Sequence, residues 1–193
     1  MSSNKASESS PLNIFSPLGI FSPLNVAVLT VSDTRCIETD TSGQLLVDRL
    51  LESGHQLGDR KLVLDDIYQI RAICSQWIAD QSMQVILITG GTGFTARDST
   101  PEALEPLFDK RVEGFGELFR QISFRDIGTS TIQSRAIAGL ANRTLIFCLP
   151  GSTNACKTAW DEIIKLQLDS RQKPCNFVQH IAMLDAEQCV TRA

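Results

Sequence analysis

Three glycines within four positions, Gly90, Gly91 and Gly93, end an apolar run and lead into a segment that carries Asp98 and Glu102. Glycine adopts positive φ angles and lets the backbone come close to a ligand. Successive N–H groups after a strand form an anion-binding concavity, and a following helix N-terminus adds positive potential. The turn predicts a phosphate site, although a tight structural turn needs the same glycines. It matches neither a Walker A motif nor GxGxxG, which weakens a dinucleotide interpretation.

Several carboxylates could act together with this turn. Asp98 would repel a bound phosphate unless a cation intervenes, and Mg²⁺ binds through one or two carboxylates plus substrate phosphates. Glu102 could instead form a capping box with Ser99 at the start of a helix. Asp33 directly follows an earlier apolar strand, and Asp40 precedes a helix, where it could simply be a neighbour of the N-cap.

Two further segments could contribute phosphate ligands. The turn Pro150-Gly151-Ser152 ends another apolar strand, and Ser152 could serve either as a helix N-cap or as a phosphate donor. Ser134 and Arg135 lie in a segment poor in fixed charge. Arg135 could hold a phosphate or form an ordinary surface salt bridge.

The elements that would position these residues alternate along the chain. We predict strands over Asn25–Ser32, Arg60–Leu64, Gln84–Thr89 and Thr144–Leu149, and helices over Thr41–Ser53, Asp66–Trp77, Thr100–Phe108, Gly114–Ile122 and Asn154–Leu166. This alternation predicts an α/β fold, with a mostly parallel central sheet covered by helices on both faces. Three strands end in the turns SDT, TGGTG and PGS. Because ligands in open α/β sheets bind beyond the carboxyl ends of the strands, we expect these turns to converge on one edge.

Composition limits the class of protein. The chain has 193 residues, of which 42% are hydrophobic and 21% charged, and this suits one domain with a tail. The net charge of −4 and the lack of a Lys/Arg block argue against a general nucleic-acid binder. No segment approaches the roughly 18–20 apolar residues of a membrane span. The Ser/Pro-rich N-terminus, with IFSPL at 14–18 and again at 20–24, is a poor secretory signal and is expected to be a disordered or surface-draped extension.

The cysteines and histidines give no catalytic constellation. The six cysteines form no CxxC pair, which favours buried or free thiols in a reducing cytoplasm over a metal site or disulfides. Cys74 and Cys148 lie in apolar contexts that are typical of core residues. His55 and His180 are distant in sequence from the turns, and we expect both on the surface.

Five separated motifs occur in order: TVSD at 30–33, DTSG at 40–43, TGGTGFTARDSTPEA at 89–103, SR at 134–135 and LPGS at 149–152. Together they resemble the MoaB/Mog family, the molybdopterin adenylyltransferase-type proteins of molybdenum cofactor biosynthesis, over residues 25–178. The stretches EGFGELFRQISF, IGTSTIQSRA and PGSTNACKTAW are most similar to the bacterial MoaB branch.

The resemblance implies a single three-layer α/β/α domain over residues 25–178, with a flexible extension at 1–24 and a tail at 179–193. It implies a homotrimer or homohexamer, and Mg²⁺-dependent transfer of AMP from ATP to molybdopterin with release of pyrophosphate. A separate molybdate-inserting protein would receive the product. In-line attack at the α-phosphate needs positioning and charge neutralisation rather than a nucleophilic side chain.

The resemblance also implies roles for individual residues. Asp33 and Asp98 would be catalytic, and Mg²⁺ would be held by Asp33, Asp40, Asp98 and Glu102. Substrate or nucleotide binding would fall to Gly90, Gly91, Thr92, Gly93, Thr95, Ser134, Arg135, Pro150, Gly151 and Ser152.

One motif departs from the family pattern. Adenylylating members tend to read PG-x-P at the last motif, and here Thr153 takes the place of the second proline. The acidic motif DSTPE, by contrast, has the form associated with active members. The alternative is therefore a catalytically weak or inactive oligomer that binds molybdopterin or a nucleotide in the same pathway.

Overall fold

A computed structural model describes residues 19–181 of the chain. Its centre is one six-stranded sheet in the order β2-β1-β3-β6-β5-β4. The strands are β1 (Asn25–Val31), β2 (Gln56–Val63), β3 (Val85–Thr89), β4 (Lys110–Arg111), β5 (Ile137–Ala141) and β6 (Thr144–Leu149). The four strands β2, β1, β3 and β6 run parallel, whereas β5 pairs antiparallel with β6, and β4 with β5. The predicted mostly parallel sheet is confirmed.

Helices follow the parallel strands, as the sequence pattern predicted. They are α1 (Thr41–Glu52), α2 (Ile67–Ala79), α3 (Thr100–Leu104), α4 (Glu113–Ile127), α5 (Thr153–Ala159) and α6 (Lys165–Gln167). A π-helical segment, Trp160–Ile164, joins α5 to α6, and short 3₁₀ segments cover Ile37–Thr39, Glu105–Leu107 and Gly128–Gln133. No helix in the described part of the chain has the length and apolar character needed to cross a membrane.

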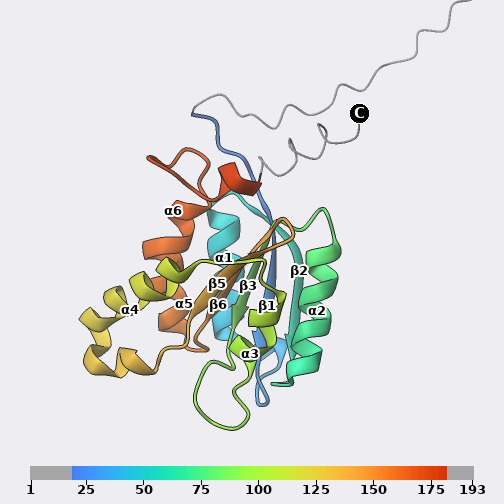
Figure 1. Ribbon diagram of the computed structural model, residues 1–193, viewed down its shortest axis with the longest axis vertical. Helices are drawn as coiled ribbons and strands as arrows, with labels where there is room; N and C mark the ends of the chain where they lie inside the picture. The colour runs from blue at the N-terminus through green and yellow to red at the C-terminus, as the bar shows by residue number, and fades with distance from the viewer. Residues whose placement is uncertain (1–18, 182–193) are drawn as a thin grey trace, which may run out of the picture.

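The helices form a layer on each face of the sheet (Figure 1). One core cluster joins α1, α4 and α5 to alternate strand residues such as Val28, Leu87 and Phe147. The other joins α2 and α3 to the intervening residues, including Leu29 and Ile88. Successive side chains of a strand point to opposite faces, so fully apolar strands supply both cores. This is the expected three-layer α/β/α architecture.

The antiparallel edge of the sheet was missed in the sequence. Strand β5 reads IAGLA, and its small residues give neither a β-branched run nor a clear alternation. Gly139 is required there because a Cβ atom would lie 2.4 Å from the ring of Phe108. Strand β2 also begins earlier and α4 ends later than predicted.

The boundary at residue 24 is not a boundary of packing. Leu24 is buried, and its N–H donates a hydrogen bond to Nδ1 of His55 at 3.2 Å. The ring of Phe21 lies 5.1 Å from that of His55, and the N–H of Ser22 donates to Ser170. We call residues 20–24 the N-terminal strap. Most of the predicted flexible extension, residues 1–18, lies outside the residues that the structure describes.

The surface placement predicted for His55 is therefore wrong. His55 is 4% exposed, whereas His180 is exposed as expected. His55 is buried because the strap covers it on one side and Trp160 packs against it on the other, with ring centroids 6.4 Å apart. At the other end of the domain, Val178 and Ile181 belong to the core, so packing also continues past residue 178.

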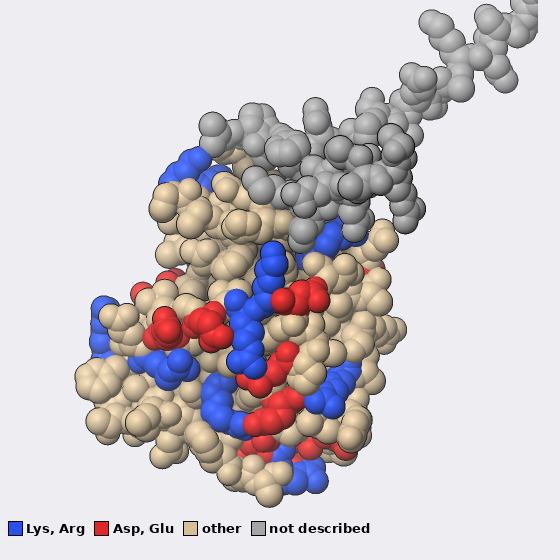
Figure 2. Space-filling view, viewed as in Figure 1, with Lys and Arg blue, Asp and Glu red and all other residues tan. Residues whose placement is uncertain are grey.

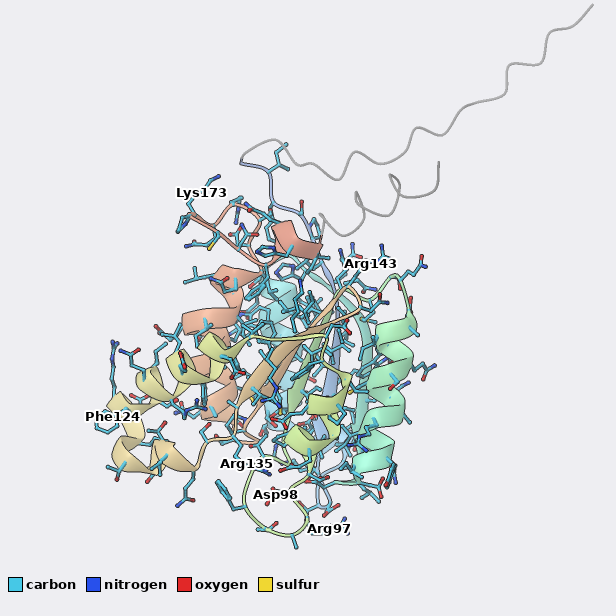
Figure 3. The ribbon with its side chains drawn as sticks, viewed as in Figure 1. Arg97, Asp98, Phe124, Arg135, Arg143 and Lys173 are labelled. Atoms are coloured by element: carbon cyan, nitrogen blue, oxygen red, sulfur yellow. The ribbon has the colours of Figure 1, made fainter. Side chains whose placement is uncertain are left out.

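Different parts of the chain lie at the two ends of the strands. The described chain ends lie at the upper end of Figure 1, and the loop between β3 and α3 lies at the lower end, where the parallel strands have their carboxyl ends. Figure 3 shows the same division, with Arg143 and Lys173 at the upper end and Arg97, Asp98 and Arg135 at the lower.

Candidate functional site

The turns after the parallel strands converge, as predicted. The chain crosses from β2 over β1 to β3, so the strand order reverses between β1 and β3, which is where open α/β sheets bind ligands. A Cβ atom on Gly151 would lie 3.2 Å from the Cα atom of Gly90, so the turns after β3 and β6 touch. Asp33, after β1, pairs with Arg97 from the loop after β3.

Gly90 and Gly91 are glycine for structural reasons as well as any functional one. Their φ angles are +103° and +63°, in the region that L-residues rarely adopt. A Cβ atom on Gly90 would lie 2.1 Å from the carbonyl oxygen of Val31. On Gly91 it would lie 2.2 Å from Oγ1 of Thr100. The tight-turn interpretation is therefore confirmed, and the close approach of this backbone to a ligand stays a prediction.

Asp33 is held by a cation and by the backbone. Arg97 donates from Nε and Nη2 to the two carboxylate oxygens at 3.0 and 2.7 Å, and the N–H of Asp65 donates at 3.1 Å. The hydrogen bonds from Arg97 are the main cause that lowers the pKa of Asp33, and burial opposes them. Asp33 is ionised at neutral pH, but Arg97 partly neutralises it.

Asp98 orders the loop in which it lies. Its Oδ2 accepts hydrogen bonds from the N–H of Thr95 at 2.9 Å and from the Thr95 hydroxyl at 2.6 Å. The hydroxyl bond is the main cause that lowers the pKa of Asp98, with backbone N–H groups of Thr95 and Gly93 adding to it. Thr95 thus acts on the carboxylate, and no contact of the described residues assigns it to a substrate.

Asp65 is a carboxylate of this site that sequence reasoning missed. It follows β2, and its Oδ1 accepts from the N–H and hydroxyl of Ser99 at 3.1 and 2.7 Å. Burial, assisted by the charges of Asp98 and Asp33, raises its pKa. The rule that ligand-binding residues follow the carboxyl ends of parallel strands would have found it, because Leu64-Asp65-Asp66 ends a predicted strand.

The predicted capping box at α3 does not form. Ser99 is the N-cap of α3, but its hydroxyl donates to Asp65 instead of accepting from the helix. Glu102 pairs with Arg135. Both side chains that could form the capping box instead bond to residues from other segments, Ser99 to Asp65 and Glu102 to Arg135.

Arg135 clamps the loop after β3 and is not free to face a phosphate. Its Nε donates to the carbonyl of Thr92 at 3.2 Å and its Nη2 to the carbonyl of Asp98 at 3.0 Å. Nη1 pairs with Glu102, and the guanidinium lies 5.3 Å from the ring centroid of Phe94. In Figure 3 Arg135 lies beside the loop that carries Asp98. The observed role of Arg135 is to hold the loop shape through backbone carbonyls.

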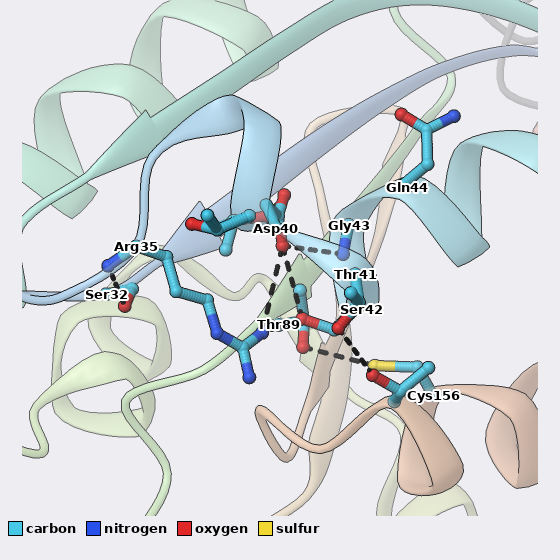
Figure 4. Close-up of polar contacts among 12 residues, drawn as sticks. Ser32, Arg35, Asp40, Thr41, Ser42, Gly43, Gln44, Thr89 and Cys156 are labelled. Atoms are coloured by element: carbon cyan, nitrogen blue, oxygen red, sulfur yellow. Dashed lines mark hydrogen bonds and ion pairs between the residues drawn. The ribbon is translucent and has the colours of Figure 1, made fainter.

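Asp40 has a structural role at the start of α1 (Figure 4). Its side chain is the N-cap, accepting from the N–H of Gly43 at 2.9 Å, and it is 1% exposed. It also accepts from the hydroxyl of Thr30 at 2.7 Å and from Arg60 at 3.1 Å. Asp40 is therefore the N-cap itself and not merely a neighbour of it.

The four carboxylates predicted to hold Mg²⁺ are not gathered into one set. Asp40 is enclosed by Thr30, Gly43 and Arg60, and Glu102 is neutralised by Arg135. Over residues 19–181, no group of three or more His, Cys, Asp or Glu side chains is arranged to hold a metal ion. The donors present therefore do not fit a resident magnesium site of that composition.

A cavity of about 360 Å³ opens beside the glycine turn. It brings together predicted binding residues from three segments: Thr92 and Gly93, Ser134, and the turn 150–152. The hydroxyl of Ser134 is buried without a hydrogen-bond partner. Ser152 is the N-cap of α5 and accepts from the N–H of Ala155 at 3.2 Å, so the N-cap alternative is confirmed. Gly90 and Gly91 do not line this cavity.

Charges around the site are local. On the face seen in Figure 2, Lys and Arg side chains alternate with Asp and Glu, and no broad area of one sign is visible. A phosphate ligand would be held by backbone groups and hydroxyls of the turns rather than by a general field.

The cysteines of the described part of the chain form no disulfide. Cys36, Cys74, Cys148, Cys156 and Cys175 are all free thiols, as predicted. Cys74 and Cys148 lie in the core, and burial raises the pKa of Cys74 to about 12. Cys189 lies outside the described residues.

Comparison with known proteins agrees with the motifs. Residues 27–170 match a family model described as a probable molybdopterin binding domain. The chain is 59% identical over 156 residues to molybdenum cofactor biosynthesis protein B of Escherichia coli (strain K12), covering 81% of this chain and 92% of that protein. It is 44% identical over 142 residues to the protein of the same name from Bacillus cereus, covering 73% and 84%.

Solved structures share the fold. A crystal structure of molybdenum cofactor biosynthesis protein B superposes with a TM-score of 0.76 at 38% identity, covering 86% of this chain and 98% of that one. The tungsten cofactor synthesizing protein MoaB from Pyrococcus furiosus superposes with a TM-score of 0.69 at 33% identity, covering 83% and 96%. With its sheet-edge turns, its glycine loop and these relatives, the chain belongs to the MoaB/Mog family of molybdenum cofactor biosynthesis proteins.

Proposed function

We propose that this protein acts in molybdenum cofactor biosynthesis by transferring AMP from ATP to molybdopterin, with release of pyrophosphate. The observation that supports this best is the cavity between the glycine turn and the turn 150–152, which adjoins a loop carrying Asp98. A pterin with a terminal phosphate would lie in the cavity, with its phosphate toward Gly93 and Ser152. ATP would enter as its magnesium complex, so that Mg²⁺ comes with the substrate.

The reaction would be an in-line displacement. The terminal phosphate oxygen of molybdopterin attacks the α-phosphorus of ATP, a new P–O bond forms, and the bond to pyrophosphate breaks. The protein's part is to align the two phosphates and exclude other nucleophiles, which is the larger share of catalysis in such transfers. Backbone N–H groups of the glycine turn would hold a phosphate, and Asp33 and Asp98 would orient the Mg-ATP. The adenylylated product would pass to a molybdate-inserting protein.

A second candidate is a protein that binds molybdopterin without adenylylating it. Two observations favour it. Both carboxylate oxygens of Asp33 accept hydrogen bonds from Arg97, and Asp98 accepts two from Thr95. In this conformation, therefore, neither carboxylate is without protein partners. The turn 150–152 also continues into Thr153 rather than a proline. Adenylylation would require Arg97 to release Asp33 when Mg-ATP enters.

The test is molybdopterin-dependent release of pyrophosphate from Mg-ATP by the purified protein and by Asp98→Asn. We expect release by the wild type and a loss of about 100-fold or more in the variant, the size seen when an electrostatic group acting on the transition state is removed. Glu117→Gln, an exposed change on α4 outside the cavity, removes the same charge and should release pyrophosphate like the wild type.

Equal release by wild type and Asp98→Asn would show that this carboxylate has no catalytic part. No release by the wild type, with molybdopterin still bound, would establish the binding-only alternative. The melting temperature of Asp98→Asn must be checked, because its bonds to Thr95 shape the loop.

A further inference from the structure

The cavity beside the glycine turn is lined by polar side chains that bond to nothing in the described protein. Its lining includes Ser123, Asp126, Ser130, Gln133, Ser134, Asn154 and Thr158. None of these seven side chains has a hydrogen bond or ion pair within residues 19–181. The sheet-edge carboxylates are different, because Asp33, Asp65 and Asp98 each accept at least two hydrogen bonds. Unused donors and acceptors gathered around one cavity are what a hydrogen-bonding ligand requires.

The cavity also has apolar walls. Phe119 is 2% exposed and lies at the cavity together with Ile127, Pro150 and Ala155. A flat ring would be held between such apolar surfaces while its edge meets the polar side chains. The cavity thus has the features that suit a planar heterocycle with several N–H and C=O groups.

Among the described residues that line this cavity, Asp126 is the one with an ionisable side chain. It lies on α4, whereas Gly93 and the turn 150–152 come from the sheet edge. A carboxylate without a bound partner accepts two parallel N–H groups well, and such charge-assisted bonds are stronger than neutral ones. Asp126 also borders a neighbouring groove that contains Arg125 and Lys157, but it is bonded to neither.

We propose that Asp126 is the specificity residue of the cavity and recognises the 2-amino-4-oxo edge of a pterin. That edge offers two N–H donors side by side, from the amino group and the adjacent ring nitrogen, and they match the two oxygens of one carboxylate. The pterin's phosphate-bearing substituent then extends toward Gly93 and Ser152. The assignment rests on the proposed function, because it takes the ligand of this cavity to be a pterin.

The test compares two ligands on two proteins. The ligands are 6-hydroxymethylpterin phosphate and the lumazine analogue, in which an oxo group replaces the 2-amino group. We expect the wild type to bind the pterin about tenfold or more tightly than the lumazine, as a charge-assisted hydrogen bond requires. Asp126→Asn should reduce that preference to about twofold or less, because its amide presents an N–H toward a ligand donor. Glu117→Gln on the same helix should keep the wild-type preference.

The outcomes separate this assignment from the proposed reaction. An undiminished preference for the pterin in a folded Asp126→Asn protein would overturn the role of Asp126, whatever the adenylylation assay shows. Failure of the wild type to bind or to prefer the pterin would overturn it as well. A preference that Asp126→Asn removes, in a wild type that releases no pyrophosphate, would support the role of Asp126 and refute only the transfer reaction.

Discussion

At the scale of residues, the turns at the carboxyl ends of the parallel strands are held in place by side-chain contacts that depend on one another. Arg97 holds Asp33, Ser99 holds Asp65, Thr95 holds Asp98, and Arg135 fixes the carbonyls of the same loop. Burial raises the pKa of Asp65, while hydrogen bonds lower those of Asp33 and Asp98. Asp65 therefore binds a proton more readily than an ordinary aspartate and its two neighbours less readily, and such shifted carboxylates are common at functional sites. The phosphate binding that we propose would depend on the backbone conformation that these contacts maintain.

The glycine turn allows a direct test of how much that backbone conformation matters for stability. Gly90→Ala places a Cβ 2.1 Å from the carbonyl of Val31 at a φ of +103°. The left-handed conformation alone costs an L-residue roughly 1–2 kcal/mol, and the backbone clash adds to this. We expect the free energy of unfolding, measured in urea, to fall by more than about 2 kcal/mol.

Gly114→Ala is the matched control for this substitution. Gly114 lies in α4, and a Cβ there meets nothing within 4 Å. Alanine in a helix is more favourable than glycine by about 0.5–1 kcal/mol, so stability should stay the same or rise slightly. Equal losses in the two variants would mean that the turn conformation at Gly90 is not the cause.

At the scale of elements, the N-terminal strap depends on a neutral histidine. Burial lowers the pKa of His55 below its ordinary value, and Asp169 partly opposes the shift. Its Nδ1 must be unprotonated to accept from the N–H of Leu24. The unfolded chain therefore binds the proton more readily than the folded one, so stability is greatest above the unfolded pKa of about 6.5 and decreases as pH falls below it. Arg171, which stacks on Phe21 beside His55, adds a further positive charge.

We expect urea unfolding midpoints to decrease between about pH 7.5 and 5.5, and the decrease to be smaller in His55→Gln. His180→Gln, at an exposed position, should retain the wild-type decrease. An identical pH profile for wild type and His55→Gln would contradict the account.

Removing residues 1–18 should leave the urea unfolding midpoints unchanged, whereas removing residues 1–24 also deletes buried Leu24 and should lower them.

The elements also show how far the sequence could be read. The parallel strands were predictable because β1, β3 and β6 are apolar on both faces, and α2 because Ile70, Cys74 and Trp77 recur at helical spacing. Strand β5 was not, because it lacks a β-branched run and its Gly139 is required by packing against Phe108. The convergence of the turns after the parallel strands followed from the strand ends. The hydrogen-bond and ion-pair partners of Asp40, Glu102 and Arg135 could not be predicted, because these partners are distant in sequence and come together only in the folded chain.

At the scale of the molecule, one end of the sheet carries the site, and α4 carries exposed apolar side chains beside it. Leu118, Phe124 and Ile127 on α4 are 41, 55 and 51% exposed, and Ile132 in the following 3₁₀ segment is 80% exposed. Figure 3 shows Phe124 at the outer side of α4. A protein–protein contact that covers α4 would bury these exposed apolar side chains. They support the expectation, drawn from the family resemblance, of a homotrimer or homohexamer.

We therefore expect the sedimentation mass to be three or six times the 21.2 kDa of one chain. If α4 lies in the contact, Phe124→Asp places a charge in an apolar interface and should reduce the mass toward one chain, because an unpaired buried charge is strongly unfavourable. Tyr68→Asp, at a 73% exposed aromatic on α2 across the sheet, should leave the mass unchanged. A wild-type mass of one chain would refute the oligomer, and a Phe124→Asp protein of unchanged mass would place the interface away from α4.

Because Asp126 and Ser123 lie on the same helix as Phe124, assembly through α4 would also fix one wall of the cavity. Phe124→Asp should then weaken pterin binding in parallel with the loss of mass.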